Sequence, residues 1–150
     1  MRKIIRDILL GLNELHRQDI VHLDIKPENI LKGKTGNYKL ADLGMARFLT
    51  QITKDINIPE GDCRYLAKEL LSRDVLTFLP DLKKSDIFSL GITAYELITL
   101  ESLEKNGKEW DSFRDGTYDY PQDSKQIYTT ELLETVRLML GPQAQDRPSA

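Results

Sequence analysis

The stretch from Ile87 to about Leu100 constrains the fold most, because apolar side chains cover nearly every face of the helix that it predicts. Its apolar residues are Ile87, Phe88, Leu90, Ile92, Ala94, Tyr95, Leu97 and Ile98. A helix that is apolar all round belongs in the centre of a core. Polar residues interrupt the stretch, which is also too short to cross a bilayer. We therefore expect this helix, capped by Ser85-Asp86, to form the centre of one globular domain.

Shorter elements are expected on either side of this helix. Apolar residues at helical spacing predict an N-terminal helix that ends at about His16. Residues 30–32 and 38–40 predict two short strands, and the glycines between them can close a hairpin. The other expected elements are a surface loop over residues 45–62, a short helix over 65–71, a polar, turn-rich segment over 101–124, and a helix from its cap at Thr130 through Leu140.

Composition excludes several classes of protein. The net charge of −3 over 150 residues argues against a nucleic-acid-binding protein, because phosphate contacts need a clustered basic surface. A single cysteine, Cys63, cannot form an internal disulfide. With His16 and His22 as the only histidines, Cys and His cannot assemble a zinc site.

One run of polar residues carries the groups that phosphoryl transfer needs. The run is His22-Leu23-Asp24-Ile25-Lys26-Pro27-Glu28-Asn29, and Asp42-Leu43-Gly44 follows it. Asp24 can accept the proton of an attacking hydroxyl, and Lys26 can lie against the transferring phosphate. Asn29 and Asp42 can hold Mg²⁺ on the phosphates of ATP. The spacing therefore predicts the catalytic loop and metal-binding turn of a protein kinase, rather than a solvated loop with a helix cap.

The predicted hairpin is expected to bring the two metal ligands together. Asn29 directly precedes its first strand, and Asp42 follows its second strand. Both side chains would then project from one rigid element.

Further along, the chain resembles the large, mainly helical C-terminal lobe of a eukaryotic protein kinase. The motifs that carry the resemblance are Ala67-Lys68-Glu69, Asp86-Ile87-Phe88-Ser89-Leu90-Gly91 and Asp146-Arg147-Pro148. The resemblance implies a mainly α fold with a short β-hairpin. It also implies that Glu69 pairs with Arg147 and that Asp86 binds the backbone of the catalytic loop. Residues 1–150 are then expected to be a partial catalytic domain, truncated at both ends.

Within the kinases, the chain most resembles the Wee/Mik/Myt family of mitotic inhibitors. The matching segments are Glu60-Gly61-Asp62-Cys63-Arg64-Tyr65-Leu66-Ala67, the run from Asp86 to Thr93, and Asn106-Gly107-Lys108-Glu109-Trp110 followed by Phe113-Arg114-Asp115-Gly116. The resemblance implies phosphorylation of an inhibitory tyrosine in a cyclin-dependent kinase, and a nuclear or cytoplasmic location with the nucleus favoured.

Two departures from the usual kinase pattern affect these expectations. Leu23 replaces the arginine that commonly precedes the catalytic aspartate, so we expect no need for a phosphate on Thr50 or Thr53 in the activation loop. Lys26, two residues after Asp24, is the pattern of serine/threonine kinases. Only the family resemblance points to tyrosine.

The sequence has no glycine-rich phosphate loop and no strand lysine of the V-A-I-K type, which kinases carry in an N-terminal lobe. We therefore expect the N-terminal lobe to be absent from these 150 residues, which alone should have little or no kinase activity. Three interpretations stay open: part of an active Wee-like kinase, part of a serine/threonine kinase of another family, or a non-catalytic truncated lobe that acts as a decoy or scaffold.

Overall fold

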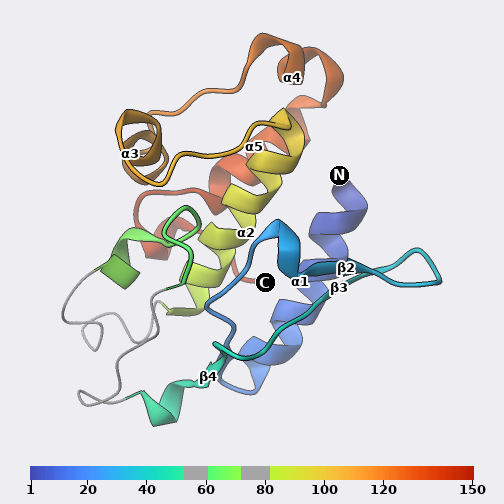
Figure 1. Ribbon diagram of the computed structural model, residues 1–150, viewed down its shortest axis with the longest axis vertical. Coiled ribbons are helices and arrows are strands. Elements are labelled where there is room, and N and C mark those ends of the chain that lie inside the picture. The colour runs from blue at the N-terminus through green and yellow to red at the C-terminus, as the bar shows by residue number, and fades with distance from the viewer. Residues whose placement is uncertain (53–60, 72–81) are drawn as a thin grey trace.

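The computed structural model describes residues 1–52, 61–71 and 82–150, and they form a mainly helical fold with two small β-sheets (Figure 1). The helices are α1 (Arg2–Arg17), α2 (Leu82–Thr99), α3 (Lys108–Asp115), α4 (Gln122–Ile127) and α5 (Thr130–Met139). The strands are β1 (Ile20–Val21), β2 (Ile30–Lys32), β3 (Tyr38–Leu40) and β4 (Arg47–Phe48). The expected fold class, mainly α with a short hairpin, is confirmed.

Helix α2 is the centre of the core, as its sequence predicts, and α1 and α5 pack against it. Ile87, Phe88 and Ile92 are completely buried. Gly91 allows α5 to come close, because a Cβ atom built there would lie 2.9 Å from Leu140. None of the helices in the described part of the chain has both the length and the apolar character needed to span a membrane.

The expected cap of α2 was wrong. The helix already includes Leu82, so Ser85 and Asp86 lie within it, and both are buried. Their side chains bind groups far away in the sequence: the Ser85 hydroxyl donates to Glu69, and the Asp86 carboxylate accepts from the backbone near His22. Hydrogen bonds to these distant partners explain why Ser85 and Asp86 lie inside the helix, although polar residues of this kind favour a helix end.

The hairpin of β2 and β3 pairs in antiparallel register, with Ile30 opposite Leu40 and Lys32 opposite Tyr38. Gly36 closes its turn with a φ of 77°, a backbone conformation that glycine adopts without steric cost. The Asp7 carboxylate of α1 accepts a hydrogen bond from the Tyr38 backbone N–H at 3.0 Å. This contact and packing of α1 against β3 hold the hairpin on the core.

Four local predictions need correction. Helix α3 lies within the segment 101–124, expected to be turns, and α4 begins in it and ends at Ile127. The buried residues are Phe113 and Arg114 in α3 and Ser124 in α4, and helices this short depend on tertiary packing that local patterns do not show. The short helix expected over 65–71 is a 3₁₀ turn, Lys68–Leu71. Thr129, not Thr130, is the cap residue of α5. Within the loop expected over 45–62, β4 pairs with β1, and residues 53–60 lie outside the described part.

Candidate active site

A carboxylate from the central helix holds the start of the catalytic loop. Asp86, 1% exposed, accepts hydrogen bonds from the backbone N–H groups of His22 and Leu23, both at 2.9 Å. His16 donates to the same carboxylate from Nε2 at 2.8 Å. Leu23 has a φ of 64°, which is strained for a leucine, and its bond to Asp86 stabilises that conformation. The role that the family resemblance implies for Asp86 is thus present in the structure.

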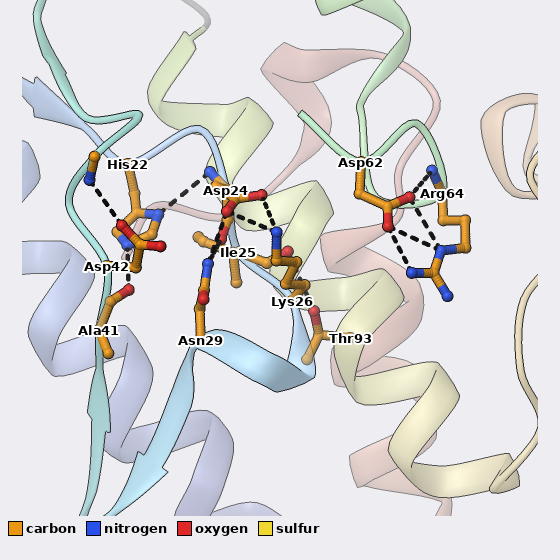
Figure 2. A network of polar contacts seen from close by, with 11 residues as sticks. His22, Asp24, Ile25, Lys26, Asn29, Ala41, Asp42, Asp62, Arg64 and Thr93 are labelled. Carbon is orange, nitrogen blue, oxygen red and sulfur yellow. Dashed lines mark hydrogen bonds and ion pairs between the residues drawn. The ribbon is translucent and has the colours of Figure 1, made fainter. Parts of the chain in front are cut away.

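Two neighbouring side chains orient the Asp24 carboxylate (Figure 2). The Lys26 ammonium lies 2.9 Å from Oδ1 and 2.8 Å from Oδ2. The Asn29 amide nitrogen donates to Oδ2 at 2.8 Å and to the Asp24 backbone carbonyl at 2.7 Å. The Asp24 side chain is 9% exposed, so it is held in place while one edge stays accessible. The sequence prediction brought these three residues together, and the structure joins them directly.

Asp42 reaches the same place from the other side of the hairpin. The Ala41 N–H donates to the Asn29 carbonyl at 2.8 Å, which brings the two sides together. His22 accepts from the Asp24 N–H at Nδ1 and therefore carries its proton on Nε2, which donates to the Ala41 carbonyl at 3.2 Å. In the described residues Asp42 has no hydrogen bond or ion pair with the other three predicted site residues. It neighbours them through Ala41.

The oxygen atoms at this site suit a magnesium ion. The Asn29 amide nitrogen is turned toward Asp24, which leaves Oδ1 as the atom that could bind a metal ion. Asp42 is exposed, and its Oδ1 accepts from the Gly44 N–H at 3.0 Å, which leaves Oδ2. Among residues 1–52, 61–71 and 82–150, no three His, Cys, Asp or Glu side chains form a metal cage. Two protein oxygens fit Mg²⁺, which keeps several waters and takes its remaining ligands from substrate phosphates.

The segment of residues 61–71 runs against the catalytic loop. A Cβ atom built on Gly61 would lie 3.1 Å from the Leu23 carbonyl oxygen. Arg64 binds both carboxylate oxygens of Asp62, and this contact holds the pKa of the Asp62 carboxyl below its usual value. Figure 2 draws this pair to the right of Lys26 in the same view. The segment therefore forms one wall next to Asp24.

Ion pairing and helix α2 support the far end of this segment. Glu69 pairs with Arg147 at 2.6 Å, as the family resemblance implies, and accepts a hydrogen bond from Ser85 at 2.7 Å. The Ser89 hydroxyl donates to the Tyr65 carbonyl at 2.8 Å. Burial raises the pKa of the Tyr65 phenol, whose hydroxyl donates to Glu96. These contacts fix the backbone of the wall.

Two further residues, His16 and Thr93, support the site, and no motif in the sequence assigns them that role. His16 lies one turn after Leu12 on the apolar stripe of α1, and that position could have predicted its burial. Thr93 donates to the Ile25 carbonyl at 3.5 Å from within α2, and no local pattern marks it.

Comparison with known proteins agrees with this geometry. The chain matches the family described as protein kinase domain over residues 1–150. Wee1-like protein kinase 2 of Homo sapiens is 35% identical and aligns with 100% of this chain and 29% of its own length. The mitosis inhibitor protein kinase wee1 of Schizosaccharomyces pombe is 33% identical, over 98% of this chain and 18% of its own.

A third relative belongs to the same group. The membrane-associated tyrosine- and threonine-specific cdc2-inhibitory kinase of Drosophila melanogaster is 35% identical, over 98% of this chain and 26% of its own length. The chain therefore belongs to the protein kinase family. Within that family it is most like the Wee kinases, and it spans less than a third of the length of these three relatives.

Proposed function

We propose that the chain is the large lobe of an ATP-dependent, Wee-like protein kinase that phosphorylates an inhibitory tyrosine of a cyclin-dependent kinase. In that role it would restrain mitotic entry. We also propose the nucleus as its location, which the family resemblance favours. The observation that carries the proposal is the Asp24 carboxylate, held by both Lys26 and Asn29 beside the wall formed by residues 61–71. The names of the relatives support the choice of substrate.

The proposed mechanism gives each polar group one task. Asp24 accepts the proton of the acceptor hydroxyl, and its fixed orientation favours a productive approach. Lys26, 2.8 Å from that carboxylate, places positive charge where the transferring phosphate arrives. Asn29 and Asp42 would hold Mg²⁺, which neutralises charge on the nucleotide phosphates when it is bound.

A second candidate, a serine/threonine kinase, is favoured by one observation. Lys26 contacts both carboxylate oxygens of Asp24, and a lysine two residues after the catalytic aspartate is the pattern of that class. The two candidates share the mechanism above and differ only in the acceptor.

The position of Leu23 supports the proposal that no activation-loop phosphate is needed. Leu23 is buried and packs with Val21, Ile52 and Leu82. An apolar contact thus occupies the position from which an arginine would bind a phosphate. Thr50 lies in the turn Leu49–Gln51, whereas Thr53 lies outside the described residues.

The natural gene product that contains this sequence provides the test. It is incubated with ATP, Mg²⁺ and a cyclin-dependent kinase, and phosphate on the acceptor is located by mass spectrometry. We expect phosphotyrosine, with the rate reduced by about 10²–10⁴-fold in an Asp24→Asn variant that keeps the size of the side chain. Phosphate on serine or threonine alone would favour the second candidate. A measurable rate that Asp24→Asn leaves unchanged would contradict the role of Asp24 in both candidates. No transfer of phosphate by the wild-type protein would favour the non-catalytic interpretation.

A further inference from the structure

Helix α3 places one arginine inside the protein, against the backbone of the wall. Arg114 is 3% exposed. Its Nη2 donates to the carbonyl oxygens of Cys63, Arg64 and Leu66 at 2.9, 3.2 and 2.6 Å. Its Nη1 donates to the Trp110 carbonyl at 2.8 Å. One side chain thus binds three of four consecutive residues of a distant segment, and their backbone conformation depends on it.

Two aromatic rings lie against the same guanidinium. Its central carbon lies 3.5 Å from the centroid of the Trp110 ring and 5.6 Å from that of Phe88. The Trp110 indole N–H donates to the Cys63 carbonyl at 2.9 Å, so α3 binds that oxygen twice. Cation–π attraction adds to the hydrogen bonds when the cation is shielded from water.

The charge of Arg114 is buried without a carboxylate. No ion pair of Arg114 occurs among the residues that the structure describes, and burial lowers its pKa to about 10, so it stays charged at neutral pH. A buried cation is costly unless hydrogen bonds satisfy it. Backbone carbonyls satisfy the two terminal nitrogens and aromatic faces cover the guanidinium, whereas its buried Nε–H has no hydrogen-bond partner among the described residues. An apolar residue would pack in the same place at lower cost, but it would not bind the carbonyls of the wall.

We infer that Arg114 is a positioning residue for the protein acceptor: through the carbonyls of residues 63–66 it fixes the wall beside Asp24, and so it sets the affinity for the acceptor rather than the rate of transfer. This inference rests on the proposed function. Arg114 touches none of the groups assigned to ATP, Mg²⁺ or the proton. Trp110 supports it by covering the guanidinium and by sharing the Cys63 carbonyl.

Steady-state kinetics on the natural gene product test the inference. Arg114→Met removes the donors and keeps most of the apolar stem. We expect the KM for the acceptor to rise about tenfold, as the loss of buried hydrogen bonds predicts, while kcat and the KM for ATP change less than about twofold. Arg114→Lys keeps one charged donor group and should restore part of the affinity. An unchanged acceptor KM, or an equal fall in kcat, would overturn the inference.

A matched arginine provides the control. Arg137 of α5 also lies over an aromatic ring, 5.7 Å from the centroid of Tyr118, but it does not contact the wall. Arg137→Met should therefore leave the acceptor KM unchanged. If Arg114→Met does not fold, Trp110→Phe gives a second test. It removes the indole donor and part of the ring over the guanidinium, keeps an aromatic side chain, and should raise the acceptor KM by a smaller factor; no rise would count against the inference.

Failure of the inference can be told from failure of the proposed function. If the wild-type protein transfers no phosphate to a protein, the proposed function fails and the inference fails with it. If it transfers phosphate and Arg114→Met keeps the wild-type KM, only the inference fails. Hydrogen exchange gives a second readout, because Arg114→Met should speed exchange of the Arg64 and Tyr65 amides while those of His22 and Leu23 stay protected by Asp86. Unchanged exchange at Arg64 and Tyr65 would contradict it.

Discussion

Two buried arginines hold the two ends of the segment 61–71 in different ways. Arg147 binds the Glu69 carboxylate, whereas Arg114 binds only backbone carbonyls. Both lie against the ring of Phe88, with their central carbons 4.8 and 5.6 Å from its centroid. The same helix α2 thus carries one aromatic ring that both cations share.

The two contacts differ in what stays buried without a partner when one side chain is removed. At one end two opposite charges are buried together, so removal of either partner leaves a bare charge in the core. At the other end the partners are neutral, and removal of the cation leaves only carbonyl groups without donors. The Glu69 end is therefore expected to support the fold, and the Arg114 end to adjust the shape of the wall.

Glu69→Ala should give the largest effect on stability. It leaves Arg147, whose side chain is fully buried, without its carboxylate, and it removes the acceptor of Ser85. We expect the free energy of unfolding to fall by about 3–5 kcal/mol, measured by urea denaturation. A double variant, Glu69→Leu with Arg147→Met, should recover much of this loss. A loss below 1 kcal/mol in the single variant would break the comparison.

Arg114→Met should cost less. Three carbonyls of the wall lose a charged donor, but the methionine removes the cost of a buried cation. We expect a fall of about 1–3 kcal/mol in the same denaturation experiment. Equal losses in Arg114→Met and Glu69→Ala would show that the two ends of the segment do not differ.

Asp62 should make the start of the wall sensitive to acid. Arg64 lowers the pKa of this carboxyl, so its stabilising effect is complete above the unfolded pKa near 4 and is lost as the pH falls through the folded pKa. Asp62→Asn should remove this dependence and cost about 0.5–1 kcal/mol at pH 7. The free energy of unfolding of the wild-type and Asp62→Asn proteins is measured between pH 2 and 7. The same loss of stability at low pH in both proteins would contradict this prediction.

Lys68→Ala should have the smallest effect and serves as the exposed control for both arginines. Lys68 and Asp115 are 3.6 Å apart with side chains 65% and 60% exposed. Exposed pairs contribute little, so we expect a change within about 0.5 kcal/mol that disappears in high salt. A larger loss would mean that surface charge, rather than the buried arginines, holds the wall to α3.

Local patterns in the sequence predicted much of the fold. The apolar residues of α2, the stripe of α1 and the glycines of the hairpin each specify one element by its own periodicity or turn chemistry. Helices α3 and α4 were missed, because short polar helices owe their stability to what they pack against. Ser85 and Asp86 were placed at a helix end for a related reason: their partners lie elsewhere in the chain.

The sequence by itself determined the polar groups around Asp24, because Asp24, Lys26 and Asn29 lie within six consecutive residues and their spacing alone brings them into contact. Only the tertiary structure decided what holds them and the wall beside them. The Asp86 carboxylate reaches Leu23 across 63 positions, and Arg114 reaches Leu66 across 48. In both cases one partner is a backbone group, which every residue has, so residue spacing and periodicity could not predict the contact. The family resemblance implied the contact of Asp86, and nothing in the sequence implied that of Arg114.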